Sequence, residues 1–320
     1  MIDSLKELLE SALERRDWID WQSPGAGDAV RLVHATADGF PGITVDLLGG
    51  ALLVVAHRRE ADTRPLIEML ARRFGDDTPV FQKERWSKEN AKRAGLQVQG
   101  LVCSPVFTIR ESGLVFMVDL VKDEHIGFFL DSRPARARVR DIAKNRRVLN
   151  LFSYTGAFGV AAVTGGARST TNVDNKRSAL TIARQNYELN QLPFNTRTFM
   201  RADAIKHLAR AVKGKGRYDL IVLDPPPYSQ RPGNRSFKAK TGYARLVARC
   251  MEILAPGGLL LSGLNAKGVS DHEFEGMLEE AGLIAKKKLE IMEIIGPGKD
   301  FPPGANRPLA RFALCAIKRQ

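Results

Sequence analysis

The sequence predicts an α/β fold in which helices cover both faces of a mostly parallel sheet, preceded by a smaller α+β unit. From about residue 130 onward, short apolar runs alternate with stretches of helical spacing, the pattern of consecutive strand–helix–strand units. Several of these runs end on an Asp or on a turn of small residues. The first 120 residues instead mix apolar runs, glycine-containing turns and two helical stretches without that alternation.

The amino-terminal part is predicted to hold a helix and linker over 1–28 and a small α+β domain over 29–120. Leucines at helical spacing indicate a helix over 4–16, and 63–74 has the same character. Between residues 30 and 55, apolar runs alternate with glycine-containing turns, which indicates strands. Further strands are expected at 79–81, 106–110 and 114–120. No cluster of catalytic side chains stands out in this domain.

Residues 121–320 are predicted to form the larger domain, in which strands and helices alternate. The strands are expected at 147–152, 169–173, 197–201, 218–223 and 258–264. The helices are expected at 156–163, 176–189, 204–212 and 243–254. Two more strand candidates flank a loop at 296–308. Open sheets of this kind bind ligands beyond the carboxyl ends of their strands, so the residues there are the first candidates for a site.

The composition is that of a soluble globular protein, with 44% hydrophobic and 27% charged residues. No run of 18 apolar residues predicts a membrane span, and the N-terminus lacks a secretory signal pattern. Cys103, Cys250 and Cys315 are widely spaced, which favours buried thiols over disulfides or metal ligands. His125 has no second histidine at metal spacing, so no metal site is expected. A cytoplasmic protein is the expectation.

The net charge of +13 is concentrated in two basic clusters, at 83–93 and 133–147. Their cations are Lys83, Arg85, Lys88, Lys92 and Arg93 in the first cluster, and Arg133, Arg136, Arg138, Arg140, Lys144, Arg146 and Arg147 in the second. Such surfaces attract polyanions through phosphate neutralisation and counterion release, although a plain solvated face is the alternative. Together with the motifs below, they favour a nucleic-acid partner. The oligomeric state is left open, a homodimer included.

The first chemical motif is the turn after the apolar run at 147–152. It reads Phe152-Ser153-Tyr154-Thr155-Gly156-Ala157-Phe158-Gly159, with glycines only at 156 and 159. A dinucleotide-binding turn needs earlier glycines to bring the backbone close to a pyrophosphate. A cofactor without phosphates, such as S-adenosylmethionine (SAM), suits this turn. A purely structural strand-to-helix turn explains the motif equally well.

Three carboxylates follow successive predicted strands. Asp174 could accept hydrogen bonds from both ribose hydroxyls of a nucleoside cofactor, and Asp203 from an adenine amino group. Each is also well placed to cap the helix that follows it. Together with Asp224, which follows the fourth strand, the three are improbable as caps alone.

The second motif, Asp224-Pro225-Pro226-Pro227-Tyr228, predicts an acceptor loop. The prolines fix the backbone and leave carbonyls exposed, while the Asp224 carboxylate can accept hydrogen bonds from an amino group. Tyr228 can stack on a base. The alternative is a proline-rich turn with a purely structural role at the end of a buried strand. The basic segment from Gln230 to Thr241 could form a lid or a plain surface loop.

Three stretches resemble the bacterial large-subunit (23S) ribosomal RNA methyltransferases, a family with cytosine carbon-5 and guanine N7 members. They are Gly-Phe-Phe-Leu-Asp-Ser-Arg at 127–133, Val-Leu-Asn-Leu-Phe-Ser-Tyr-Thr-Gly at 148–156 and Leu-Asp-Pro-Pro-Pro-Tyr-Ser at 223–229. The resemblance implies a seven-stranded, Rossmann-like class I SAM domain over 121–320, behind a substrate-recognition domain over 29–120. It implies cofactor contacts from Phe129, Asp131, Arg133, Phe152, Tyr154, Thr155, Gly156, Asp174, Asp203 and Asp224. It implies an acceptor loop of Asp224, Pro225, Pro226 and Tyr228.

Two departures from that family bear on the substrate. Its cytosine carbon-5 members carry a PUA RNA-binding domain, for which the residues before 30 are too few. They also use a cysteine thiolate, whereas the stretch after the predicted fifth strand reads Leu261-Ser262-Gly263-Leu264-Asn265-Ala266. We therefore expect a base nitrogen of ribosomal RNA, guanine N7 or an exocyclic amine, as acceptor. A methyltransferase of a small molecule and a catalytically silent RNA-binding factor are the alternatives.

Overall fold

The computed structural model describes residues 2–17, 27–87, 89, 95–122, 125–214, 216–229, 237–266, 268–304 and 309–318. The chain forms two compact units. The first comprises Met1–Leu130 and Gly298–Arg307, and the second comprises Asp131–Pro297 and Pro308–Gln320. The predicted boundary at 120/121 therefore lies ten residues before the point where the second unit begins. The loop Gly298–Arg307, expected within the larger domain, groups with the first unit.

In its described residues, the first unit contains a five-stranded sheet, two α-helices and a two-stranded hairpin. The sheet has the order β1-β2-β3-β4-β5. Its strands are β1 (Ala29–His34), β2 (Ile43–Leu48), β3 (Ala51–Ala56), β4 (Val80–Glu84) and β5 (Leu96–Gln99). A short η1 helix (Ala35–Asp38) links β1 to β2, and the hairpin β6 (Val106–Glu111) and β7 (Leu114–Asp119) follows the sheet. The edge strand β5 was missing from the sequence-based expectation.

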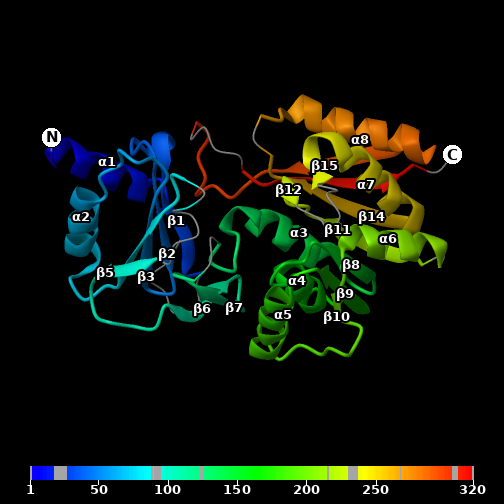
Figure 1. Ribbon diagram of the computed structural model, residues 1–320, viewed down its shortest axis with the longest axis horizontal. Helices are drawn as coiled ribbons and strands as arrows, with labels where there is room; N and C mark the ends of the chain where they lie inside the picture. The colour runs from blue at the N-terminus through cyan, green and yellow to red at the C-terminus, as the bar shows by residue number, and fades with distance from the viewer. Residues whose placement is uncertain are drawn as a thin grey trace. The chain divides into compact units, whose positions relative to one another are not determined.

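Two amphipathic helices bury their apolar faces against this sheet. They are α1 (Ile2–Glu14) and α2 (Arg64–Phe74), which lie together on one side of it (Figure 1). Leu9 and Leu13 of α1 and Leu66 and Leu70 of α2 share one core with strand residues such as Leu32. Helix α2 connects β3 to β4, the one parallel pair of the sheet, as a crossover helix does.

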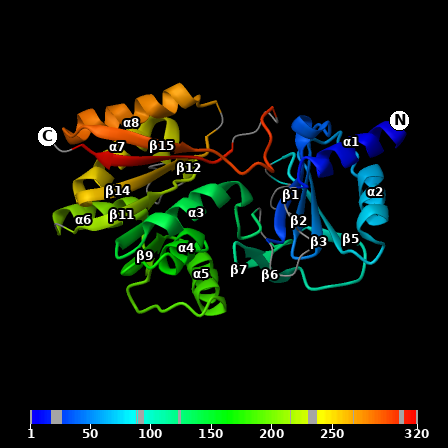
Figure 2. The ribbon, with the colours of Figure 1, turned by 180° about the vertical axis from the view of Figure 1, so that it is seen from behind.

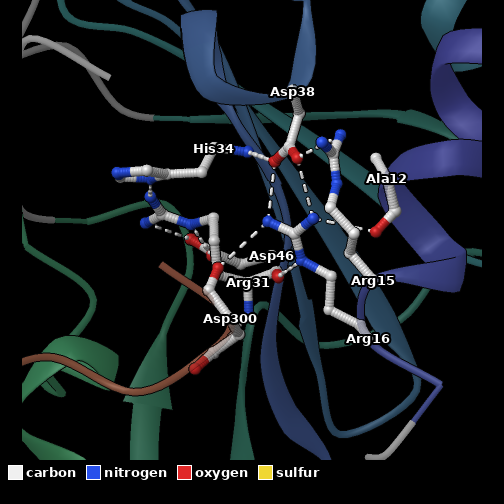
Figure 3. Close-up of polar contacts among 8 residues, drawn as sticks. All are labelled: Ala12, Arg15, Arg16, Arg31, His34, Asp38, Asp46 and Asp300. Atoms are coloured by element: carbon white, nitrogen blue, oxygen red, sulfur yellow. Dashed lines mark hydrogen bonds and ion pairs between the residues drawn. The ribbon is translucent and has the colours of Figure 1, made fainter. Parts of the chain in front are cut away.

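A buried ion network joins the end of α1 to the sheet and to the loop Gly298–Arg307 (Figure 3). The fully buried Arg16 guanidinium donates to both Asp38 carboxylate oxygens, at 2.8 and 2.6 Å. It also donates to the Asp300 carbonyl at 3.1 Å, and the Asp300 carboxylate accepts from the Arg31 N–H at 3.0 Å. The Arg31 side chain pairs with Asp46. These contacts explain why a segment near the C-terminus belongs to the first unit.

The second unit is a seven-stranded, mostly parallel sheet, which confirms the predicted architecture. Its order is β10-β9-β8-β11-β14-β16-β15. The strands are β8 (Arg147–Leu151), β9 (Ser169–Asp174), β10 (Phe199–Arg201), β11 (Tyr218–Leu223), β14 (Leu254–Leu264), β15 (Leu289–Ile295) and β16 (Arg311–Ile317). The five strands from β10 to β14 pair in parallel, and β16 runs antiparallel to both of its neighbours.

Helices cover both faces of this sheet. Those of the second unit are η3 (Leu130–Ser132, which straddles the unit boundary), α3 (Arg133–Ile142), α4 (Ala157–Thr164), α5 (Arg177–Leu189), α6 (Ala204–Lys213), α7 (Ala239–Ile253) and α8 (Asp271–Ala285). Alternate strand residues point to opposite faces: Leu149 and Ile221 pack with α6, α7 and α8, whereas Val148 and Leu220 pack with α3 and α4. Figures 1 and 2 show the two helical layers on either side of the sheet.

No helix in the described parts of the chain combines the length and the apolar character that a membrane crossing requires.

Candidate cofactor and acceptor site

The carboxyl ends of four parallel strands bring most of the predicted site residues to one edge of the second unit's sheet. The turn from Phe152 to Gly156 follows β8, and Asp174 ends β9. Asp203 lies two residues after β10, and Asp224 directly follows β11. Chain order reverses between β8 and β11, because β9 and β10 lie on one side of β8 while β11 and β14 lie on the other. Ligands of open α/β sheets bind at this reversal point.

The turn after β8 has an unusual backbone. Phe152 and Tyr154 have φ values of 56° and 49°, and Gly156 has 76°. A left-handed conformation costs a non-glycine residue on the order of 1–3 kcal/mol and persists only where surrounding contacts fix it. Here the Ser153 N–H donates to the Val173 carbonyl at 3.0 Å, and the Gly156 N–H donates to the Ser153 carbonyl at 2.8 Å. Strain of this kind is typical of functional turns.

The Asp174 carboxylate fixes the same turn from the neighbouring strand. One of its oxygens accepts from the backbone N–H of Tyr154 at 2.9 Å, and the other accepts from the N–H of Lys176 at 2.9 Å. The second contact lies just before α5, whose N-cap residue is Lys176, so the capping alternative that the sequence left open does not apply to Asp174. A carboxylate has about four acceptor positions, so Asp174 can still accept hydrogen bonds from a ligand.

Buried amide side chains support the turn from below, and the sequence did not single them out. The Asn186 side chain donates to the Thr155 carbonyl at 2.9 Å. Asn172 accepts from Asn150 at 2.9 Å and donates to the Tyr187 hydroxyl at 2.9 Å. Burial raises the pKa of Tyr187 to about 12, so it stays a neutral hydrogen-bonding group. These asparagines occupy helix and strand positions that resemble ordinary surface residues in a sequence.

Two glycines allow this close packing. A Cβ at Gly156 would lie 2.9 Å from the Ala183 Cβ. A Cβ at Gly159 would lie 2.2 Å from the Asn172 Oδ1 and 2.6 Å from the Tyr187 hydroxyl. The absence of a Cβ at both glycines therefore allows the helices and strands beneath the turn to pack closely. Gly156 also adopts the positive φ that the turn requires.

Asp203 caps a helix. Its side chain accepts from the backbone N–H of Lys206 at 2.8 Å, at the start of α6. The structural alternative raised for this residue therefore applies, and any contact with a cofactor would be made in addition to the cap.

Asp224 lies against the backbone of the neighbouring strand β14. A Cβ at Gly263 would stand 2.9 Å from the Asp224 Oδ1, and it would also clash with Phe312. Gly263 is held by the buried Tyr243 hydroxyl, which donates to its carbonyl at 2.7 Å and contacts the Ser262 hydroxyl at 2.8 Å. A glycine inside a predicted strand is a sign of close backbone approach, which could have pointed to Gly263 in the sequence.

The charge of Asp224 is set by its burial and by two neighbours. The pKa of the Asp224 carboxyl is raised to about 7, mainly by burial and further by the Asp131 carboxylate, while the Arg136 guanidinium lowers it. Asp131 accepts from the Ala310 N–H at 3.0 Å, and Arg136 is buried with 4% exposure. When both are ionised, the Asp131 and Asp224 carboxylates act on one another as like charges, and Arg136 opposes this effect at Asp224. This set suits a cation, such as a sulfonium, and disfavours a phosphate.

The proline loop after Asp224 leads into a short strand. Pro225 is buried, Pro226 is exposed, and the loop reaches β12 (Tyr228–Ser229). The backbone of β12 pairs with β13 (Phe237–Lys238). The Tyr228 side chain and residues 230–236 of the basic segment lie outside what the structure describes.

Two other predicted residues lie near the unit boundary. Arg133 is partly buried at the start of α3 in the second unit. Phe129 belongs to the first unit, where its ring centroid lies 5.1 Å from that of His125. Within the described residues, no group of His, Cys, Asp and Glu side chains is arranged to hold a metal ion.

Within the first basic cluster, at 83–93, Lys83 needs correction as part of a nucleic-acid surface. Lys83 is buried, with 4% of its surface exposed, and its side-chain carbons pack beside Gly95. It therefore cannot present its charge to a bound strand. Lys88, Lys92 and Arg93 lie outside the described residues.

The second basic cluster, at 133–147, does not form one surface. Arg136 is buried beside Asp224, and Arg138 pairs with Glu293 at 2.7 Å. Arg147 pairs with Asp219 at 3.1 Å, where β8 and β11 begin, at the edge of the sheet opposite the predicted site. Helix α3 thus carries this sequence run from one edge of the sheet to the other, which a charge count could not reveal.

Comparison with known proteins identifies relatives that cover most of the chain. Residues 30–306 match the model of the S-adenosylmethionine-dependent methyltransferase family. The "Ribosomal RNA large subunit methyltransferase I" of Erwinia tasmaniensis is 33% identical over 96% of this chain and 78% of its own length. The protein of the same name from Yersinia pseudotuberculosis is 33% identical over 92% and 76%. A solved structure of a protein assigned as a methyltransferase, complexed with SAH, superposes with a TM-score of 0.88 at 24% identity, covering 98% of this chain and 82% of that one.

Proposed function

Because this chain belongs to the S-adenosylmethionine-dependent methyltransferase family, we propose that it methylates a base nitrogen of large-subunit ribosomal RNA. The cofactor is SAM. The relatives at 33% identity are named for large-subunit ribosomal RNA, which supports the same class of substrate here. SAM supplies a methyl group activated on a positively charged sulfur.

The carboxyl edge of the second unit offers suitable partners for SAM. In the proposal, the strained turn from Phe152 to Gly156 and the Asp174 carboxylate hold the adenosine part, with Asp203 as a further acceptor. The Asp131–Asp224 pair faces the positive sulfur. The turn lacks the glycines of a pyrophosphate cradle, in keeping with a cofactor that has no phosphate.

The state of the cysteines is the observation that carries the choice of a nitrogen acceptor. Methylation of cytosine carbon-5 needs a thiolate that adds to the ring. Cys250 and Cys315 are fully buried, and burial raises the pKa of Cys250 strongly and that of Cys315 to about 12. Cys103 is exposed but belongs to the first unit. The end of β14, next to Asp224, carries Gly263 and Leu264 and no thiol.

A nitrogen lone pair can attack the methyl group directly, so positioning and exclusion of water supply much of the rate. The rigid proline loop at 225–227 offers backbone carbonyls, and Asp224 offers a carboxylate. Both can accept hydrogen bonds from an exocyclic amine and orient its lone pair. Guanine N7 carries no proton, and for that acceptor Asp224 would instead bind the N–H groups of the same base.

An assay with purified protein, labelled SAM and large-subunit RNA that lacks the mark tests the proposal. After digestion to nucleosides, mass spectrometry should find an N-methylated base and no 5-methylcytosine. Activity on RNA should fall by roughly tenfold or more between 50 and 200 mM salt, because several phosphate contacts release counterions. Formation of 5-methylcytosine would contradict the nitrogen acceptor.

The second candidate function is methylation of a small molecule. The burial and ion pairing of several basic residues favour it, because they reduce the cationic surface available to RNA. Methylation of a small acceptor would depend little on salt. Turnover that stays constant over the same salt range would favour that alternative.

A further inference from the structure

The Asp224 carboxyl occupies an electrostatically unbalanced position. Asp131, in the turn before α3, repels its negative charge, and Arg136 of α3 attracts it. From β14, the Gly263 backbone lies close to one oxygen, but the neighbouring Tyr243 hydroxyl of α7 donates to the Gly263 carbonyl. The ionised form of Asp224 is therefore favoured by one guanidinium and opposed by one carboxylate and by its burial.

We propose that Asp224 releases a proton when SAM binds and takes a proton up again when the cofactor is SAH. The inference rests on the proposed placement of the SAM sulfonium at this edge of the sheet. SAM carries a positive charge on its sulfur, and SAH, which remains after methyl transfer, carries none. Binding of SAM therefore favours the ionised form of the Asp224 carboxyl, whereas binding of SAH does not. Apart from the transferred methyl group and this charge, the two ligands are the same.

The expected coupling is large enough to measure. A cation held within about 5 Å of a carboxylate, at an effective dielectric constant of about 20, favours the ionised form on the order of 100-fold. Burial and Asp131 hold the pKa of Asp224 at about 7 in the free protein. Binding of SAM should then release about 0.5 proton at pH 7 and about 0.8 proton at pH 6. Binding of SAH should release no proton from Asp224 at either pH.

This coupling has a consequence for turnover. Above pH 7, Asp224 is ionised in the free protein, and the negative site favours SAM over SAH. Below pH 7, binding of SAM is coupled to the loss of a proton from Asp224, which weakens the binding. The affinity for SAM relative to SAH should therefore fall about 25-fold in total between pH 7 and pH 5, and stay nearly constant above about pH 8.

Calorimetric titration tests the coupling without any RNA. SAM and SAH are titrated into the full chain at pH 6 and 7, in phosphate and in Tris buffers, whose different ionisation enthalpies report the protons released. For the wild-type protein, the number of protons released per SAM bound should exceed the number released per SAH bound by about 0.5 or more. Asp224→Asn, which keeps the shape but cannot ionise, should lose this difference. Asp219→Asn, at the opposite edge of the sheet, should retain it.

Equal proton release for SAM and SAH in wild type would overturn the inference, as would a difference that persists in Asp224→Asn. If that variant does not fold, the pH dependence of the SAM-to-SAH affinity ratio in wild type decides alone: a ratio constant from pH 5 to 8 contradicts the coupling. The measurement is independent of the proposed acceptor. Proton release with no RNA methylation would contradict the proposed function alone, and RNA methylation with no differential release would contradict the coupling alone.

Discussion

The Asp174 carboxylate accepts a hydrogen bond from the backbone N–H of Tyr154 at 2.9 Å, so the last residue of β9 fixes the turn that follows β8. This contact joins two neighbouring strand ends at the point where the chain order of the sheet reverses. It holds a non-glycine residue in the left-handed region, with φ of 49°. The turn is therefore set before any ligand arrives, which lowers the ordering cost of binding.

Replacement of Asp174 by Ala should weaken SAM binding more than it weakens the fold. The change removes a charged acceptor from the Tyr154 N–H, and a hydrogen bond of this kind contributes about 1.5–3 kcal/mol. We expect the Kd for SAM to rise roughly 10–100-fold, measured by calorimetry. Asp219→Ala is the matched control, because Asp219 also accepts from a backbone N–H, that of Arg147 at 2.9 Å, but at the other edge. An equal loss of SAM affinity in both variants would show that Asp174 acts through stability alone.

Gly156→Ala should destabilise the protein by more than its backbone conformation explains. Gly156 has φ of 76°, and a Cβ there would lie 2.9 Å from the Ala183 Cβ. Gly257 has a similar φ of 74° with nothing within 4 Å of its would-be Cβ, so Gly257→Ala isolates the backbone cost of about 1 kcal/mol. Urea denaturation should give a loss for Gly156→Ala that is larger by about 1–3 kcal/mol. Equal losses would mean that the contact with α5 relaxes freely.

The stability of the protein should depend on the ionisation of Asp224. Its pKa of about 7 in the folded state lies above the ordinary aspartate value of 3.8, so the folded state binds the proton more tightly than the unfolded state. The contribution to stability is full below about pH 4 and is lost as the pH rises to 7. Asp224→Asn should therefore be more stable than wild type at pH 8, by roughly 2–4 kcal/mol, and should lose that advantage toward pH 4. A difference that does not change with pH, measured by urea denaturation, would contradict this account.

Arg16 should be far more important to the first unit than its neighbour Arg15. Both pair with Asp38, but the Arg16 side chain is fully buried whereas that of Arg15 is 46% exposed. Removing one partner of a buried pair leaves an uncompensated charge and costs about 3–5 kcal/mol, whereas an exposed pair is worth about 0–1 kcal/mol. Arg16→Ala should lower the free energy of unfolding accordingly, and Arg15→Ala should change it little. Similar losses in both variants would argue against the buried network.

Most of the second unit could be predicted from the sequence, because each apolar run of its sheet is bounded by clear turn or helix signals. The strand ends predicted at 152, 173 and 223 lie within one residue of the observed ends at 151, 174 and 223. The edge strand β5 was not predicted, since Leu96–Gln99 alternates apolar and polar residues over only four positions. Contacts between distant segments were equally out of reach: Arg16 meets Asp300 across 284 positions.

The candidate site was predictable in position but not in its charges. The motifs placed Asp174 and Asp224 at strand ends, since a strand that leads into a turn can be recognised locally. Burial cannot be recognised in that way. Arg136 was counted among surface cations although it is buried beside Asp224, and Lys83 is buried as well. Charge counts treat every Lys and Arg as solvated, so they overestimate the surface available to RNA.

Methylation of large-subunit RNA in the cell tests the central claim most directly. Ribosomal RNA from a strain that lacks the gene is digested and compared by mass spectrometry with RNA from the parent, and from strains complemented with wild type or with Asp224→Asn. The account predicts that one N-methylated base disappears on deletion, returns with the wild-type gene and stays strongly reduced with the variant. Identical nucleoside profiles in parent and deletion strains would contradict it.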